Sequence, residues 1–307
     1  MSEKCTDTPI YNELFKSVRH QLDRQALREI LLAAHGKKIS RLSLPEGQIP
    51  EIVTELERAG LWVDLHHQKQ ILNQDQGKGG WASGYGLEVP VESPLPGYVL
   101  LYTGTDPAKV LAAKKAEYAH QHRTFGTFLG YPPCCIGFYE THLAQAECEQ
   151  GDFILPLLEV SLTEKSGKPD IFPAWTNVAA QYFGYGLISF YPCSFFCEQA
   201  AAAAQEAWKL MAIYDAELAA AFLAASRMPI LYTEYEGIYA FTGAKLKGDV
   251  LHYDNTRLEC LLNGVIASVL AQGDAIAIRS HRSVDVLCGN SLVARLESPS
   301  LGLLIFD

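Results

Sequence analysis

Hydrophobic and polar residues alternate with two different periods along the first third of the chain. Apolar residues three or four positions apart predict amphipathic helices over residues 10–35 and 52–59. Alternating or continuous apolar runs predict strands over residues 39–44, 61–65 and 98–102. A strand, a short helix and a second strand in succession are typical of a βαβ unit. The pattern therefore implies a parallel pair of strands in an α/β layer.

The middle of the chain is predicted to be helical. Asp106 is a suitable N-cap, and the proline that follows it favours a helix that runs to about residue 122. A second helix is expected over residues 134–149. The alanine-rich residues 194–227 predict one long helix or a broken pair of helices, which a Met-Pro sequence ends.

After Pro229 the pattern is that of strands. β-branched and aromatic residues fill positions 230–241, with a turn near Gly237. The other elements expected here are strands over residues 275–278, 284–287 and 292–296, a hairpin turn at Gly289-Asn290, and a helix over 261–270. The predicted fold class is mixed α/β and α+β, with an N-terminal α/β layer, a helical cysteine-bearing middle and a small C-terminal antiparallel β unit. Two domains are predicted, over residues 1–228 and 229–307.

Composition and charge narrow the classes of protein that fit. The 307 residues are 49% hydrophobic and carry a net charge of −10, which argues against a general nucleic-acid-binding surface. No nucleic acid is therefore expected as a partner. The N-terminal residues lack the apolar run of a signal peptide, and no apolar run is long enough for a membrane span. A cytoplasmic protein without a membrane partner is expected, in which eight cysteines serve more often as thiols, metal ligands or redox groups than as disulfides.

Two pairs of cysteines follow prolines at expected helix starts. The first pair is Cys134 and Cys135, after two prolines, and the second is Cys193 and Cys197, after one. Backbone N–H groups and the helix dipole at such positions favour thiolates, which are the form that binds metal. On a helix, Cys193 and Cys197 would share one face, about 6 Å apart along the axis. Four thiolates from two helix starts predict a metal ion or an iron–sulfur cluster.

The adjacent first pair leaves the number of ligands open. Neighbouring helical residues diverge by about 100° around the axis, but at a helix start the first of the pair need not be helical, and both sulfurs can then turn the same way. Otherwise one cysteine lines the pocket, and a cluster held by three cysteines keeps an iron position for a substrate. The remaining alternatives are a redox dithiol and thiols that simply fill the core.

Among cofactors, a [4Fe-4S] cluster is the leading hypothesis, with zinc as the alternative. Structural zinc sites usually separate paired cysteines by two to four residues, which an adjacent pair does not. Aromatic residues that would bury a cluster flank both pairs: Phe138, Tyr139, Phe190, Tyr191, Phe195 and Phe196. The predicted function is an iron–sulfur protein, an enzyme for redox or Lewis-acid chemistry, with a small-molecule substrate or redox partner. The alternatives are a non-catalytic protein with structural zinc and a thiol–disulfide redox protein.

The two cysteine motifs also support a resemblance to a family. Residues 129–135 read Leu-Gly-Tyr-Pro-Pro-Cys-Cys, and residues 191–198 read Tyr-Pro-Cys-Ser-Phe-Phe-Cys-Glu. Over about residues 97–210 the chain resembles a prokaryotic family of domains of unknown function marked by Gly-Tyr-Pro-x-Cys-Cys and Pro-Cys-Ser-x-x-Cys. The resemblance strengthens the grouping of the four cysteines and implies no substrate or activity.

Other candidate residues are weaker. His142 would lie on the same helix face as Cys135, about 10 Å further along, where it could act as an acid or base in a pocket. His66 and His67 are neighbours on a strand and should face opposite sides, so no joint metal site is expected there. The glycine-rich residues 74–86 predict a loop, whose Lys78 and Trp81 could cover an anionic or planar ligand. The remaining cysteines are expected to be structural: Cys5, Cys148, Cys260 and Cys288.

Overall fold

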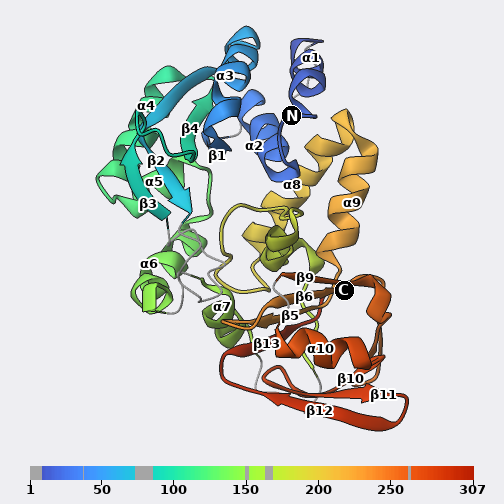
Figure 1. The fold of residues 1–307 in the computed structure, drawn as a ribbon. Coiled ribbons are helices and arrows are strands. Elements are labelled where there is room, and N and C mark those ends of the chain that lie inside the picture. Colours follow the sequence, from blue (N-terminus) through green and yellow to red (C-terminus); the bar gives the residue numbers. More distant parts are fainter. Residues whose placement is uncertain (1–8, 37, 73–85, 149–151, 163–168, 262–263) are drawn as a thin grey trace. The chain divides into compact units, whose positions relative to one another are not determined.

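The computed structural model describes residues 9–36, 38–72, 86–148, 152–162, 169–261 and 264–307 (Figure 1). Over these residues it is a mixed α/β fold with three sheets, and neighbouring strands within each sheet run antiparallel. The described residues form two compact units. The first consists of the described residues within Met1–Asp75, Tyr85–Glu140 and Glu206–Ala219, and the second of those within Thr141–Gln205 and Ala220–Asp307.

The first unit is built on a four-stranded sheet in the order β1-β4-β2-β3. Its strands are β1 (Ser40–Pro45), β2 (Trp62–Leu72), β3 (Gly86–Pro90) and β4 (Tyr98–Gly104). The helices that accompany it are α1 (Pro9–Val18), α2 (Arg24–Ala34), α3 (Ile49–Arg58), α4 (Pro107–Tyr118), α5 (His122–Phe128) and the start of α6 (Pro133–Cys148). Asp106 caps α4 as expected, because its carboxylate accepts the N–H groups of Ala108 and Lys109.

The parallel strand pair predicted in this unit is wrong. β1 and β2 each pair with β4, antiparallel in both cases, so they point the same way but do not touch each other. β4 occupies the centre of the sheet because it is buried along nearly its whole length: only Tyr98, its first residue, is exposed. A strand that is apolar on both faces gains most from a central position.

The single helix predicted over residues 10–35 is also wrong, because it is two helices. α1 ends at Val18, and α2 begins at Arg24, after the N-cap residue Asp23. The Asp23 carboxylate accepts the Ala26 N–H at 2.8 Å. An aspartate that satisfies a free N–H of the first turn favours a helix start over a helix interior.

The predicted C-terminal antiparallel strands are present in the second unit. One sheet has the order β12-β11-β10-β8-β7 and the other the order β13-β5-β6-β9. The strands are β5 (Ile230–Thr233), β6 (Ile238–Phe241), β7 (Lys245–Lys247), β8 (Val250–His252), β9 (Leu258–Leu261), β10 (Ala275–Ser280), β11 (Ser283–Cys288), β12 (Ser291–Glu297) and β13 (Leu301–Leu304). Gly289 turns the β11–β12 hairpin with φ +59°. Side chains from both sheets and from α10 (Val265–Gln272) form one hydrophobic core.

The second unit also contains segments that precede the strands. These are α7 (Ile154–Ser161), the 3₁₀ helices η4 (Ala174–Thr176) and η5 (Val178–Phe183), and the first part of α8 (Glu198–Tyr214). Backbone hydrogen bonds tie Phe172 to the chain end: its N–H donates to the Ile305 carbonyl at 2.8 Å, and its carbonyl accepts the Asp307 N–H at 3.1 Å. The domain boundary predicted at residue 228 stays a prediction, because the two compact units are groups of residues close in space and not segments known to fold alone.

The alanine-rich region forms the broken pair that the sequence allowed. α8 ends at Tyr214 and α9 (Ala216–Ser226) follows it. Asp215 causes the break, because its carboxylate accepts the Leu218 N–H at 2.9 Å and so caps α9. None of the described helices has both the length and the apolar character that crossing a bilayer requires.

Candidate metal centre

The first cysteine pair follows a tight stop between two helices. α5 ends in a Schellman motif, in which the Gly130 N–H donates to the Thr127 carbonyl at 3.1 Å and the Tyr131 N–H to the Gly126 carbonyl at 2.9 Å. Gly130 adopts φ +72°, a left-handed conformation that glycine takes at no steric cost. The Gly-Tyr-Pro part of the motif therefore ends one helix and lets the chain turn before the next.

The second helix, α6, then starts at once. The Pro132 carbonyl accepts the N–H groups of Cys135 at 2.9 Å and of Ile136 at 3.0 Å, so Pro132 is the N-cap. Cys134 and Cys135 are thus the second and third residues of α6, and the predicted place of this pair at a helix start is confirmed. Their Sγ atoms lie 3.8 Å apart, with Cys135 buried and Cys134 partly exposed. Adjacent positions in the first helical turn therefore do not keep the two sulfurs apart.

The second cysteine pair is not on a helix, and that prediction is wrong. α8 begins at Glu198, so Cys193 precedes it and Cys197 is its N-cap residue. The Cys197 carbonyl accepts the Ala201 N–H at 3.0 Å, and its Sγ accepts the Ala200 N–H at 3.5 Å. The Cys197 N–H donates to the Ser194 carbonyl at 3.0 Å, which closes a turn. Ser194 favours this turn over helix because its hydroxyl also accepts a backbone N–H, two residues on, at 3.1 Å.

Buried side chains brace this cysteine turn, residues 193–197. The Phe195 N–H donates to Ser161 Oγ at 2.8 Å, and the Phe195 carbonyl accepts the Thr176 hydroxyl at 2.5 Å. The Phe195 ring is fully buried against Phe172, with ring centroids 4.6 Å apart. Both backbone groups of Phe195 are therefore satisfied without secondary structure, which lets an irregular turn exist in a buried place.

The sulfur atoms of Cys134, Cys135, Cys193 and Cys197 all lie within 4.8 Å of one another. That is close enough for the four to bind one metal. Cys135 and Cys197 are buried, and Cys134 and Cys193 keep some exposure. Within the described part of the chain, no histidine or carboxylate joins this group.

The other predicted residues lie elsewhere. Lys78 and Trp81 fall outside the described residues, and so does Cys5. Cys148 is the last residue of α6. Cys260 lies on β9, where burial raises the pKa of its thiol, and Cys288 is exposed at the end of β11. His142 lies on α6 and is partly exposed.

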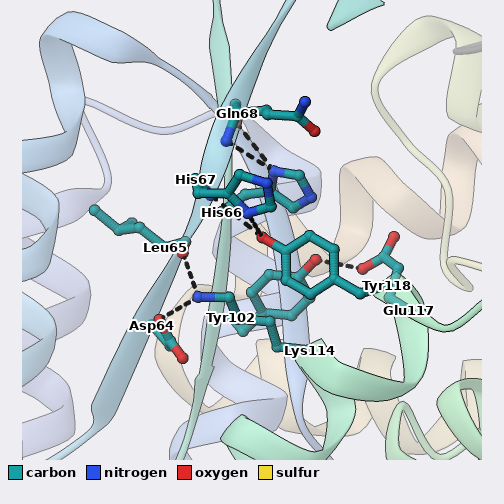
Figure 2. Close-up of polar contacts among 9 residues, drawn as sticks. All are labelled: Asp64, Leu65, His66, His67, Gln68, Tyr102, Lys114, Glu117 and Tyr118. Atoms are coloured by element: carbon teal, nitrogen blue, oxygen red, sulfur yellow. Dashed lines mark hydrogen bonds and ion pairs between the residues drawn. The ribbon is translucent and has the colours of Figure 1, made fainter. Parts of the chain in front are cut away.

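His66 and His67 lie on the same side of β2, contrary to the sequence prediction (Figure 2). The pairing of β2 with β4 shifts between Leu65 and Lys69, so a bulge breaks the alternation of side chains. The two imidazole rings stack with centroids 5.0 Å apart and planes 9° apart, and Tyr118 packs on both. Stacked rings direct their nitrogen lone pairs side by side rather than toward one point, so the two do not share a metal ion.

Hydrogen bonds from α4 hold the bulge in place, as Figure 2 shows. The Tyr118 hydroxyl lies 2.5 Å from His67 Nδ1, and Lys114 Nζ donates to both the Asp64 carboxylate and the Leu65 carbonyl at 2.7 Å. Burial lowers the pKa of His66. These contacts join α4 to the distorted part of β2. The residues that make them therefore have a structural role.

Sequence reasoning missed one buried polar cluster. Asp152, just before α7, accepts hydrogen bonds from the hydroxyls of Tyr182, Tyr191 and Tyr232. An isolated aspartate beside an apolar segment was the available signal, because such a residue needs partners when the segment is buried. Nothing in the spacing of the tyrosines indicated that they were those partners.

Comparison of the chain with protein-family models, with curated proteins and with solved structures finds no match.

Proposed function

We propose that this chain is a metal-binding protein whose four cysteines hold one ion, with zinc as that ion, in a closed tetrathiolate site. The observation that carries the proposal is the mutual approach of four sulfur atoms to within 4.8 Å. Four soft thiolates in a tetrahedral arrangement suit zinc or iron and disfavour magnesium and calcium, which prefer oxygen ligands.

The sulfur separations support a single ion over a cluster. Zn–S bonds of about 2.3 Å at tetrahedral angles place neighbouring sulfurs about 3.8 Å apart. The Cys134 and Cys135 sulfurs are separated by 3.8 Å. The cysteine sulfurs around a [4Fe-4S] cluster stand roughly 6 Å apart, because four irons and four sulfides lie between them. The zinc alternative therefore fits these distances better than the leading sequence hypothesis.

Backbone N–H groups at both pairs favour negative charge on sulfur. Cys134 and Cys135 lie in the first turn of α6, where the N–H groups point outward and the positive end of the helix dipole attracts anions. The Cys197 sulfur accepts the Ala200 N–H. Hydrogen bonds of this kind partly neutralise a tetrathiolate, whose two excess negative charges would otherwise be costly in a buried place.

A site with four protein ligands leaves no position for a substrate. The role that follows is structural, because the ion joins the start of α6 to the turn before α8. These two segments are far apart in the sequence, with 58 residues from Cys135 to Cys193. Chemistry on a small molecule would need one of the four cysteines to leave the metal, as in the three-cysteine cluster that the sequence also allowed.

Metal and sulfide analysis tests the proposal. The full chain is purified without oxygen and with reduced thiols, and zinc, iron and acid-labile sulfide are measured per chain. One zinc ion without sulfide is expected, lost in Cys135→Ser and Cys197→Ser and retained in the control Cys288→Ser. Iron with an equal amount of sulfide would replace the proposal with a cluster, and metal-free protein from zinc-supplemented cells would refute both.

A further inference from the structure

Asp152 is a buried carboxylate whose partners are hydroxyls rather than cations. It is 2% exposed, and among the described residues no lysine, arginine or histidine forms an ion pair with it. Oδ2 accepts the hydroxyls of Tyr182 and, at 2.9 Å, of Tyr232. Oδ1 accepts the Tyr191 hydroxyl at 3.2 Å and the Ile154 N–H at 3.1 Å.

Burial of a carboxylate has a large desolvation cost, so the presence of Asp152 in this place needs an explanation. Burial raises the pKa of Asp152 and raises the pKa of each tyrosine that contacts it, so the phenols remain donors. The hydrogen bonds offset the desolvation of the carboxylate, but an apolar residue in its place would need no such offset. What the carboxylate provides instead is a fixed point that joins four segments: the start of α7, η5, residue 191 and β5.

One of these segments leads directly to a metal ligand. Tyr191 is followed by Pro192 and then Cys193, and the proline ring restricts the backbone between the two. Tyr191 is held from several sides: its ring packs on Phe153 with centroids 4.9 Å apart, and its hydroxyl lies 3.4 Å from Gln181 Nε2. The entry to the cysteine turn is therefore fixed at Tyr191, just as its centre is fixed at Phe195.

We propose that Asp152 is a positioning residue for the metal site, acting through Tyr191 to hold Cys193 where the ion binds. The inference rests on the proposed function, because it concerns how that site is prepared. Groups that orient metal ligands in this way are worth roughly 10- to 100-fold in metal affinity. Preformed geometry supplies this gain because the ligand does not have to be ordered when the ion arrives.

Cobalt binding to the full chain provides the test. Co²⁺ is titrated into reduced, metal-free protein, and the visible absorption of tetrahedral cobalt–thiolate is recorded for the wild type, Tyr191→Phe and Asp152→Asn. Tyr232→Phe is the matched control, because it removes one hydroxyl from the same carboxylate but lies on β5, 35 residues after Cys197 in the sequence. Thermal unfolding of the metal-free proteins measures the loss of stability separately.

Tyr191→Phe should weaken cobalt binding roughly 10- to 100-fold and change the cobalt spectrum, as expected when one thiolate is badly placed. Asp152→Asn should do at least as much. Tyr232→Phe should lower the unfolding temperature yet bind cobalt within about threefold of the wild type. If Tyr191→Phe and Tyr232→Phe bind cobalt equally well, the cluster only stabilises the fold and the inference is wrong. If the wild type gives no cobalt–thiolate absorption, the metal site itself is refuted, which is a different result.

Discussion

The two cysteine pairs offer the same ligands but are supported in different ways. The first pair lies in a helix whose start is fixed by its own neighbours, through the Schellman motif at Gly130 and the carbonyl of Pro132. The second pair spans a turn that depends on Ser161 and Thr176, which lie 34 and 19 residues from Phe195 in the sequence. Local backbone geometry positions one half of the site, and tertiary hydrogen bonds position the other.

This difference predicts which cysteine pair depends more on the bound ion to keep its structure. A helix start keeps its backbone hydrogen bonds whether or not metal is present, because they are made within a few residues. An irregular turn keeps its shape only while the rest of its unit is folded around it. We therefore expect the second pair to be the half of the site that responds to metal removal, to packing changes and to pH.

Removal of the ion should have the largest effect. Chelation of a structural zinc ion lowers the free energy of unfolding by several kcal/mol, because the binding free energy of the ion is lost. The unfolding temperature should therefore fall by roughly 10 °C or more. Amide hydrogen exchange should then accelerate more at Cys197 than at Cys135. The control is the Cys135→Ser protein, whose unfolding temperature the chelator should leave unchanged. Equal acceleration at both cysteines would mean that the two halves are supported alike.

The difference in support also explains what the sequence could predict. The start of α6 follows from Gly130 and the two prolines, all within a few residues of the first pair. The turn at Cys193 was predicted as helix, because the bonds that stabilise it come from Ser161 and Thr176, which no local pattern connects to it. The convergence of the four sulfurs was predicted from chemistry, since four thiolates at two expected helix starts can bind one metal ion or cluster. Asp152 was missed for the same reason as the turn.

Ser161→Ala should be the next most damaging change. It leaves the buried Phe195 N–H without its acceptor, which costs about 1–3 kcal/mol of unfolding free energy. Metal affinity should fall as well, since Phe195 lies in the cysteine turn. Ser17→Ala is a matched control, because the Ser17 hydroxyl donates only to the Leu14 carbonyl of its own helix. Denaturant unfolding and a zinc competition assay measure the two quantities, and a Ser161 variant as stable as the Ser17 variant would contradict the role of this bond.

Gly130→Ala tests the support of the first pair. An alanine at φ +72° is strained by about 1–2 kcal/mol, so the protein should lose that much stability. Gly137→Ala, further along α6, is the control: a Cβ there meets no atom within 4 Å, and alanine is about 0.5–1 kcal/mol better than glycine inside a helix. If both substitutions stabilise the protein, the left-handed stop before the first pair is not needed.

The smallest effect should be a pH dependence carried by the surroundings of the second pair. His281 is buried, its Nδ1 lies 2.5 Å from the Leu303 carbonyl, and its Nε2 accepts the Asp170 N–H at 3.0 Å, so the ring is neutral. Burial is the largest influence and lowers the pKa of His281, while the Asp170 carboxylate opposes this and Arg282 adds to it. The ring also lies 5.6 Å from Phe172, which packs on the cysteine turn.

The direction of this pH dependence follows from which state binds the proton first. The unfolded chain takes up a proton on this histidine at about pH 6.5, whereas the folded chain does so only at lower pH. The stability is therefore complete above pH 6.5 and decreases as the pH falls below it, by at most about 1.4 kcal/mol per pH unit. His281→Gln should flatten this part of the profile, and replacement of the exposed His252 should leave it as it is. Unfolding curves between pH 7 and 5 measure the slope; an unchanged slope in His281→Gln would place the pH-sensitive group elsewhere, and the second pair would then lose one of the features that set it apart from the first.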